Sequence, residues 1–332
     1  MATMQAVVLD GTGGIEVQER PVPEPGPGEV IIAPGATGIC GTDLHLRDGH
    51  YAAGRYPLVP GHEFAGHITA VGAGVTTFAE GDLVAADPNI SCGACRLCRM
   101  GAVNLCDHVT ALGVNLPGSC AEYVVAPASV VVPLPASLDP GVGALIEPLS
   151  CVLNAVERAP GWQDAVMVIV GAGCIGLLAT AVATHLGAAE VHVVEPHELR
   201  QGSARSLGAT SAVAAVADLG LDDSVDVVLD ASGHPGAITA AISLLRKRGR
   251  MIQMGVAHPD TSIPVFPYAI YGKELSYLGA NSCGRSFRPA ADLMVDLADA
   301  VRPLITHTFP LTAYADAVAA MRAPEAVKVQ IA

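Results

Sequence analysis

The sequence predicts an α/β protein in which a small all-β domain is followed by a doubly wound parallel-sheet domain. Three observations support this fold class. The first 148 residues are rich in Gly, Pro and Val, with short apolar runs between turn residues. From about residue 150, apolar strands alternate with Ala- and Leu-rich helical segments. A Gly-x-Gly-x-x-Gly pattern begins at the end of the first of these strands.

The composition limits the classes of function. With 332 residues, 51 % of them hydrophobic and 15 % charged, the chain is long enough for about two well-packed domains. Its formal net charge of −14 and its aromatic content of 4 % argue against binding to nucleic acid. The N-terminus has no basic segment followed by an apolar block, so we expect a cytoplasmic protein. The uncharged run 165–184 contains the glycine pattern, which favours a buried strand and a helix start over a membrane span.

Short strands separated by turn residues are expected in the first region. The segments "EVIIA" (29–33), "GHITAVG" (66–72) and "AEYVVAP" (121–127) have the apolar content of strands. The proline-dense segment 20–29 is expected to be an extended connector, because proline disfavours both helix and central strand.

The second region alternates strands and helices, which predicts a parallel sheet. The candidate strands are 165–171, 190–195, 211–215, 225–231, 250–255 and 275–280, and the candidate helices between them are 175–187, 198–208 and 236–249. The tail, 281–332, has mixed character and is expected to return to the first domain. The predicted domains are therefore 1–148 with 281–332, and 149–280.

The glycine pattern indicates a dinucleotide site. Gly171 permits a tight turn, Gly173 lets the backbone approach a pyrophosphate, and Gly176 allows the helix to pack closely on the strand. Phosphates would lie at the helix N-terminus, where free N–H groups favour anions. Glu195 ends the second strand, where an acid binds the ribose 2′-hydroxyl and repels a 2′-phosphate, so NAD(H) is expected over NADP(H). Arg200 is expected either over the adenine or at the surface.

A second group of residues suggests a catalytic zinc ion. Cys40, His62 and Glu63 offer S, N and O donors that suit zinc with one position open to substrate. A bound zinc ion lowers the pKa of a hydroxyl, which prepares an alcohol to give up a hydride. Thr42 and His45 follow the cysteine closely and could carry the released proton to solvent.

Four cysteines lie within residues 91–106, and disulfides, a structural metal or a nucleic-acid-binding zinc module could explain them. Disulfides are disfavoured in a reducing compartment, and the acidic charge argues against nucleic acid. The spacing C-x-x-C-x-x-C-x7-C can close around one tetrahedral ion. The residues expected to bind a structural zinc ion are Cys92, Cys95, Cys98 and Cys106.

Over essentially its whole length the chain resembles the zinc-containing medium-chain alcohol and polyol dehydrogenases. The resemblance is carried by "CGTDLH" (40–45), "GHEFAGHITAVGAGV" (61–75) and the cysteine segment, in the order typical of that family. It implies a GroES-like catalytic domain, a Rossmann-like coenzyme domain, an active site between them and two zinc ions per chain. It also implies that Thr42 and His45 form the proton relay.

The segment "GALIEPLSCVLNA" (143–155) resembles the polyol and threonine dehydrogenase branch, which implies that Glu147 faces the catalytic zinc. Glu63, Glu147 or water then completes the metal shell. The resemblance also implies that Ile175 and the segment Met254, Gly255 and Val256 line the coenzyme.

Two positions, 282 and 120, depart from the pattern, and Cys120 stands where the family usually has a bulky apolar residue. Ser282 stands where many polyol dehydrogenases have an arginine, with Arg285 close by, which argues against an open-chain sugar alcohol as substrate. Cys283 is expected to be a small buried apolar residue.

The expected function is a zinc-dependent, NAD-linked dehydrogenase that interconverts a secondary alcohol and a ketone. The small-molecule substrate is expected to be a polyol, cyclitol or amino alcohol, with a threonine-type 3-hydroxy amino acid as the alternative. A non-catalytic NAD(H)-binding protein is the alternative from another class. The family precedent implies a homodimer or homotetramer, without nucleic-acid or membrane partners.

Overall fold

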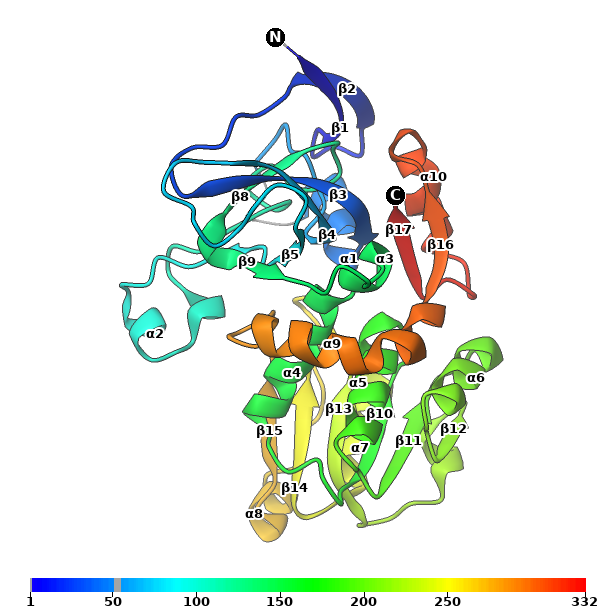
Figure 1. Cartoon of the computed structure of the whole chain (residues 1–332). Helices are drawn as coiled ribbons and strands as arrows, with labels where there is room; N and C mark the ends of the chain where they lie inside the picture. Colours follow the sequence, from blue (N-terminus) through cyan, green and yellow to red (C-terminus); the bar gives the residue numbers. More distant parts are fainter. Residues whose placement is uncertain (1, 51–54) are drawn as a thin grey trace. The chain divides into compact units, whose positions relative to one another are not determined.

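The computed structural model describes residues 2–50 and 55–332. The chain divides into two compact units, the first formed by Met1–Ser150 with Cys283–Ala332 and the second by Cys151–Ser282. The tail therefore belongs to the same unit as the N-terminal region, and its strands β16 and β17, orange and red in Figure 1, join the sheet that contains the blue strand β3.

The first unit is built mainly from strands. They are β1 (Thr3–Leu9), β2 (Ile15–Pro21), β3 (Glu29–Ile39), β4 (Glu63–Val71), β5 (Leu83–Ala86), β6 (Asn89–Ile90), β7 (Thr110–Ala111), β8 (Val124–Pro127), β9 (Val131–Pro133), β16 (Ile305–Phe309) and β17 (Lys328–Ile331). Its helices are α1 (Gly41–Arg47), α2 (Arg96–Arg99), α3 (Pro140–Gly143), α9 (Phe287–Val301) and α10 (Tyr314–Ala320), with 3-10 turns at Val103–Leu105, Ala128–Val130, Arg302–Leu304 and Leu311–Ala313. Helix α4 (Ile146–Arg158) begins in this unit and continues into the next.

The main sheet of the first unit has the strand order β16-β17-β3-β4-β5-β9, with β8 also paired to β3. Val30 and Ile32 of β3 pack into one buried cluster, whereas Ile39 at its other end packs into a different one. The pairing of β3 with β4 is irregular between Pro34 and Ala36. Because an extra residue reverses which side chains face a given side of a sheet, one strand can serve both clusters.

The irregular strand β3 also positions the residues that follow it. Gly38 near its end pairs with Glu63, the first residue of β4. The two strands are antiparallel, so Cys40, just after β3, and His62, just before β4, lie at the same edge of the sheet.

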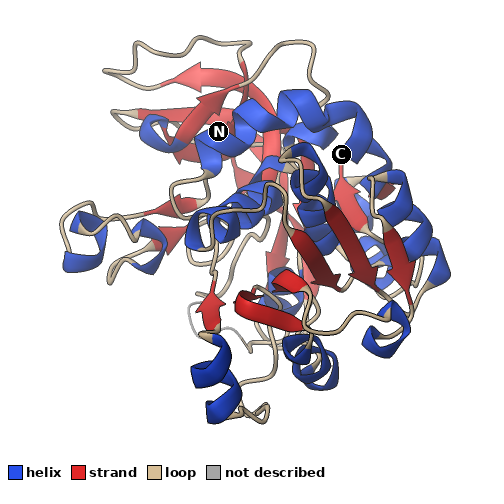
Figure 2. Cartoon of the chain, turned by 90° about the horizontal axis from the view of Figure 1, so that it is seen from below, coloured by secondary structure: helices blue, strands red, loops and turns tan. Residues whose placement is uncertain are grey.

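The second unit is a parallel six-stranded sheet with the order β12-β11-β10-β13-β14-β15. Figure 2 shows its strands between helices. The strands are β10 (Val166–Val170), β11 (Glu190–Val194), β12 (Ser211–Val213), β13 (Val225–Asp230), β14 (Leu245–Gln253) and β15 (Ser276–Gly279), and the helices are α5 (Cys174–His185), α6 (Glu198–Ser206), α7 (Pro235–Ser243) and α8 (Pro267–Lys273), with a 3-10 turn at Val216–Leu219.

This strand order, in which the third, second and first strands are followed by the fourth, fifth and sixth, is that of dinucleotide-binding doubly wound sheets. The predicted fold class is confirmed. The uncharged run 165–184 forms β10 and most of α5, and in the described residues no helix has the length and apolar character needed to span a membrane.

Candidate functional site

The second unit has a cleft of about 690 Å³ at the carboxyl ends of its central strands. Ligands of doubly wound sheets bind at this edge, where the strand order reverses. Gly171, Gly173, Glu195 and Arg200 all line this cleft. Ile175, Met254 and Val256 do not contribute to its lining, and the Val256 side chain is 85 % exposed.

The glycine turn has the geometry that its residues predict. Gly171 has a φ of +97°, a conformation that side chains other than glycine rarely adopt. A Cβ added at Gly176 would lie 1.8 Å from the carbonyl oxygen of Gly171, so only glycine allows α5 to start this close to the turn. The turn thus leaves the N-terminus of α5 open at the cleft.

Glu195 is a buried carboxylate that ties the turn to the next strand. Its Oε2 accepts a hydrogen bond from the backbone N–H of Ala172 at 2.8 Å, and its Oε1 accepts one from His197 at 3.0 Å. Each carboxylate oxygen can accept more than one hydrogen bond, so the group retains capacity for a hydroxyl donor.

The last residue of β13 is a buried acid that the sequence did not single out. Asp230 is fully buried, and its Oδ1 accepts hydrogen bonds from the backbone N–H and hydroxyl of Ser232. Its carbonyl oxygen accepts from the N–H groups of Met254 and Gly255. The predicted segment 254–256 is therefore anchored to a neighbouring strand end of the same sheet edge.

In the first unit, Cys40, His62 and Glu63 form a donor cluster. Their donor atoms lie within 4.8 Å of one another. Cys40 is the N-cap of α1, and its backbone N–H donates to Asp43 Oδ2 at 2.8 Å. The capping interaction fixes the start of the helix and with it the direction of the thiol.

His62 and Asp43 form a buried pair behind this cluster. His62 Nδ1 lies 3.6 Å from Asp43 Oδ1, and both atoms are buried without a hydrogen-bond partner in the described chain. A small shift would bring them into a hydrogen bond, which would leave Nε2 of His62 as the donor to a metal. Two orphaned polar atoms beside three convergent donors fit a site that is completed by a cation.

Glu63 forms a buried ion pair with a residue that the sequence did not single out. Lys328 Nζ, on β17, is 2.5 Å from Glu63 Oε2, and the two side chains are 4 % and 2 % exposed. The other carboxylate oxygen, Oε1, accepts no hydrogen bond from any described residue, so it can serve as a metal donor. Nothing in the local sequence links these residues, because they are separated by 265 positions.

Glu147 lies outside the set of three donors. Its carboxylate accepts a hydrogen bond from the Cys283 thiol at 3.3 Å. Burial raises the pKa of Glu147 to about 7, His62 opposes this rise and the Glu63 carboxylate adds to it. Cys283, expected to be merely an apolar residue, is therefore a polar partner of the second acid.

Thr42 and His45 lie on α1 three residues apart, which places them on neighbouring positions of one helix face. Thr42 Oγ1 is 3.8 Å from Cys40 Sγ, and its side chain is half-buried. His45 is exposed to solvent. The pair extends from the donor cluster to the surface of the unit.

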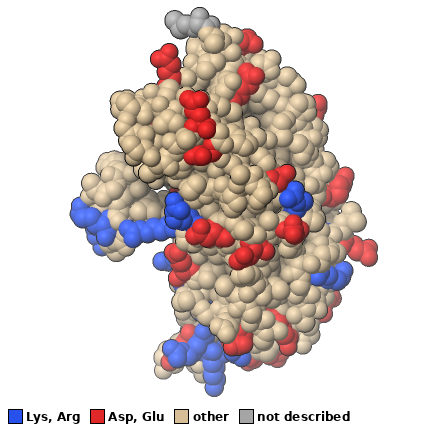
Figure 3. Space-filling view, viewed as in Figure 1, with Lys and Arg blue, Asp and Glu red and all other residues tan. Residues whose placement is uncertain are grey.

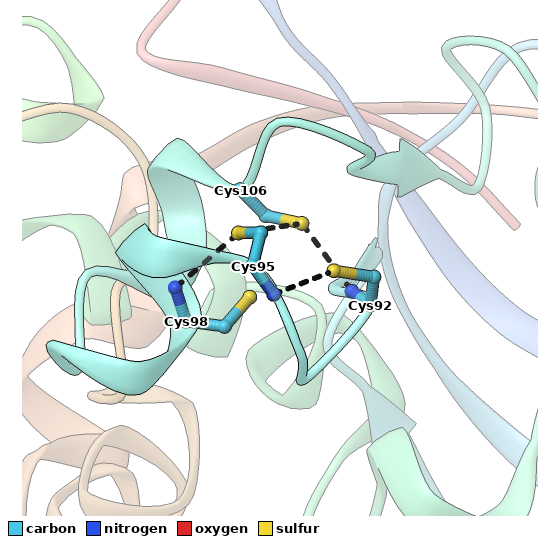
Figure 4. Close-up of side chains that lie close together, drawn as sticks. All are labelled: Cys92, Cys95, Cys98 and Cys106. Carbon is cyan, nitrogen blue, oxygen red and sulfur yellow. Dashed lines mark hydrogen bonds between the residues drawn. The ribbon is translucent and has the colours of Figure 1, made fainter.

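The cysteine lobe (residues 91–106) gathers its four thiols at one point, as Figure 4 shows. All four sulfur atoms lie within 4.8 Å of one another. Backbone N–H groups of Cys92 and His108 donate to Cys106 Sγ, each at 3.3 Å. Similar bonds to Cys95, chiefly from the backbone of Cys98, lower the pKa of its thiol to about 6. The bonds to Cys95 favour its thiolate, the form that binds zinc, whereas burial raises the pKa of the Cys98 thiol to about 11.

Known proteins match both units. A family model described as "Alcohol dehydrogenase GroES-like domain" matches residues 26–136, and one described as "Zinc-binding dehydrogenase" matches residues 174–296. The chain is 34 % identical to D-altritol 5-dehydrogenase of Agrobacterium fabrum, covering 93 % of each sequence. It is 36 % identical to L-threonine 3-dehydrogenase of Saccharopolyspora erythraea, covering 95 % of each.

A solved structure agrees with these matches. The crystal structure of a zinc-binding dehydrogenase from Sinorhizobium meliloti 1021 bound to NADP superposes with a TM-score of 0.94 at 32 % identity, over 100 % of this chain and 99 % of that one. Fold and donor set thus define a zinc-binding, nicotinamide-linked alcohol dehydrogenase. The chain belongs to the zinc-dependent medium-chain dehydrogenase family, in its polyol and threonine dehydrogenase branch.

The predicted family, enzyme class and secondary-alcohol oxidation are therefore confirmed, and the substrate is not resolved by these relatives.

Proposed function

We propose that the protein oxidises a polyol, cyclitol or amino alcohol to a ketone with NAD⁺, using one catalytic and one structural zinc ion. The observation that carries this proposal is the convergence of the half-buried Cys40 with the buried His62 and Glu63, beside the buried atoms of Asp43 and His62 that have no hydrogen-bond partner in the described chain. The alternative substrate class is a threonine-type 3-hydroxy amino acid, in line with the named relative of that activity.

Cys40, His62 and Glu63 would hold the catalytic zinc, with Glu147 available as an exchanging carboxylate, and the cysteine lobe would hold the structural one. When bound, zinc supplies a Lewis acid that lowers the pKa of the substrate hydroxyl, and the nicotinamide accepts the hydride from the carbinol carbon.

The chain's own side chains position the donors and move the proton. Asp43 orients the imidazole of His62, and Lys328 keeps Glu63 in place while balancing its charge. Thr42 Oγ1 accepts the hydroxyl proton of the substrate while its own hydroxyl proton passes on towards the exposed imidazole of His45, which releases a proton to solvent.

NAD⁺ is proposed over NADP⁺ because a carboxylate lines the nucleotide cleft at the end of β11. Glu195 would accept a hydrogen bond from a ribose hydroxyl and repel a 2′-phosphate. Since the Sinorhizobium structure was bound to NADP, the choice needs a direct test. We expect a higher kcat/KM with NAD⁺ in the wild type and a smaller preference in Glu195→Gln. Equal or better use of NADP⁺ by the wild type would overturn this assignment.

A homodimer or homotetramer is proposed from the edge of the second unit's sheet. Strand β15 is its last strand, and most of its residues are exposed. Around α8, exposed apolar side chains include Phe266 at 66 % and Tyr271 at 82 %. An edge strand with an apolar border is a self-pairing surface for a second copy. Sedimentation equilibrium of wild type and Tyr271→Glu tests this, since a monomeric wild type would contradict it.

The central test combines metal analysis with a substrate panel. Purified protein is measured for zinc per chain and assayed for NAD⁺ reduction with polyols, cyclitols and L-threonine. Zinc in both sites and turnover of one of these alcohols would support the proposal, and turnover of L-threonine alone would select the alternative. Zinc in the cysteine lobe only, with no alcohol oxidised, would indicate a non-catalytic NAD(H)-binding protein.

A further inference from the structure

Asp230 differs from the other acids of its region. The acidic side chains visible in Figure 3 lie at the surface, where water balances their charge, whereas Asp230 is 0 % exposed. Asp223 and Asp226, shortly before it in the chain, pair with Lys273 and Arg246. Among the described residues, no basic side chain forms an ion pair with Asp230. Because a buried charge is costly unless it is compensated, hydrogen bonds must balance this acid.

Four donor groups supply that balance. Oδ1 of Asp230 accepts hydrogen bonds from the backbone N–H of Ser232 at 3.0 Å and from its hydroxyl at 2.6 Å. Oδ2 accepts from the backbone N–H of Gly233 at 3.0 Å and from the side-chain amide of Gln253 at 2.5 Å. A carboxylate offers only acceptors, whereas an amide of the same size would turn its own N–H groups towards two of these donors. The arrangement therefore suits an acid and not its amide.

The carboxylate of Asp230 lies between two loops of the same sheet edge, one after β13 and one after β14. A Cβ added at Gly255 would lie 2.2 Å from the backbone N of Gly233 and 2.4 Å from Asp230 Oδ2. A Cβ added at Gly233, whose φ is +69°, would lie 2.6 Å from the carbonyl oxygen of Val256. The two loops thus meet backbone to backbone around the carboxylate, which leaves it little room to move.

Hydrogen bonds lead from this carboxylate to the nucleotide cleft. The Ser232 hydroxyl, which donates to Asp230, accepts a hydrogen bond from the backbone N–H of His234 at 3.1 Å. His234 lines the cleft and is the N-cap of α7, where its Nδ1 accepts from the backbone N–H of Ala237 at 3.3 Å. Because Nδ1 is an acceptor, the proton of the neutral ring lies on Nε2, which can donate to a ligand. Backbone and ring of His234 are therefore both held in place.

The lining of the cleft indicates which half of the coenzyme His234 meets. The glycine turn, expected at the pyrophosphate, and Glu195, expected at the adenosine ribose, line the same cleft as His234. Met254 and Val256, also expected at the coenzyme, do not. Much of the remaining lining is small and apolar, namely Ala214, Ala215, Val216, Ala217, Ala237 and Ala240. An apolar lining with a few polar groups suits a purine ring, whose nitrogen atoms accept hydrogen bonds.

We propose that Asp230 is a positioning residue for the coenzyme, which acts through Ser232 to hold His234 where it donates a hydrogen bond to the adenosine half. His234 contacts the ligand, and Asp230 acts only through it. The inference rests on the proposed nicotinamide-linked function and deepens it at the nucleotide site. Loss of the Asp230 carboxylate should weaken nucleotide binding and leave zinc binding intact, because both zinc sites belong to the other unit.

ADP-ribose, which has the adenosine and the pyrophosphate but no nicotinamide, tests the inference without turnover. It is titrated by isothermal calorimetry into the zinc-loaded wild type, Asp230→Asn, Ser232→Ala and His234→Asn. An asparagine at the last position still accepts the capping hydrogen bond of α7, so only the imidazole is lost. Loss of one hydrogen bond to the ligand corresponds to a rise in Kd of about two- to tenfold, which we expect in each variant.

A double variant and a stability control distinguish positioning from a general loss of structure. Because Asp230 acts through His234, adding Asp230→Asn to His234→Asn should raise the Kd little further. Val228→Ala is the control, since Val228 is a fully buried residue of the same strand that packs in the apolar core. The cavity it leaves lowers Tm, but the Kd for ADP-ribose should stay at the wild-type value.

The outcomes separate this inference from the broader function. Equal Kd values in wild type, Asp230→Asn and Ser232→Ala would overturn the inference and leave the dehydrogenase function standing. Additive losses in the double variant would also overturn it, because Asp230 would then not act through His234. If Asp230→Asn does not fold, Ser232→Ala, at an exposed position, replaces it in the same comparison with His234→Asn. A wild type that binds neither ADP-ribose nor NADH would contradict the nucleotide site and the proposed function together.

Discussion

The two clusters of metal donors in the first unit are built in opposite ways. The cysteine lobe takes all four sulfur donors from a segment of fifteen residues, 92–106, and Cys92 is exposed. The donor cluster joins Cys40 to the buried His62 and Glu63 through the ends of two paired strands. It also depends on Lys328, which is 265 positions away from Glu63.

The charges of the two clusters are balanced differently. In the lobe, backbone N–H groups such as those of Cys92 and His108 donate to a sulfur, and Cys92 itself is exposed. In the donor cluster, Asp43 and Lys328 provide the balance from buried side chains. An uncompensated charge costs much more in a buried site, so substitutions there should have the larger effects.

The largest effect is expected for Cys40→Ala, which removes a donor from the buried cluster. Metal catalysis contributes several kcal/mol to transition-state stabilisation, so kcat/KM should fall on the order of a thousandfold. Zinc content should fall by one ion per chain while the lobe keeps its own. Steady-state kinetics and elemental analysis check both results, and an active variant with unchanged zinc would exclude Cys40 as a ligand.

The contrast also explains which features could be read from the sequence. The lobe and the glycine turn are local, so spacing alone predicted Cys92 to Cys106 and Gly171 to Gly176. The parallel sheet followed from the alternation of apolar strands and helices, because each strand there is buried on both faces. Lys328, Asp43 and Cys283 escaped prediction as site residues, since their roles arise only when distant segments pack together. Lone residues of these types have no pattern that marks them.

The next largest effect is expected for Lys328→Met, which should lower the free energy of unfolding. This substitution leaves the Glu63 carboxylate buried without its ion-pair partner, and breaking such a pair costs about 3–5 kcal/mol. Chemical denaturation of the zinc-loaded protein measures the free energy of unfolding. The matched control is Glu63→Gln with Lys328→Met, which removes both charges and should recover most of the loss. If the double variant also keeps zinc and activity, Glu63 is the partner of Lys328 and not a required ligand.

A smaller effect is expected for Asp43→Asn, which keeps the size of the side chain but removes its charge. Losing an acid that orients a metal-binding histidine lowers metal affinity or activity about 10–100-fold. Competition with a chromophoric chelator measures zinc affinity, and only the donor-cluster ion should be weakened. Asp48→Asn, an acid of the same region paired with Arg47, is the control. Equal zinc affinities in Asp43→Asn and wild type would rule out the positioning role of Asp43.

The smallest effect on turnover is expected in the lobe. Cys106→Ser removes a sulfur that accepts two backbone hydrogen bonds, so the lobe should lose its zinc and its local order. A structural ion does no chemistry, and the donor cluster has its own buried partners, so kcat should stay unchanged while Tm falls. A fall in kcat as large as that of Cys40→Ala would show that the two clusters are coupled, and the contrast between a local and an assembled site would then fail.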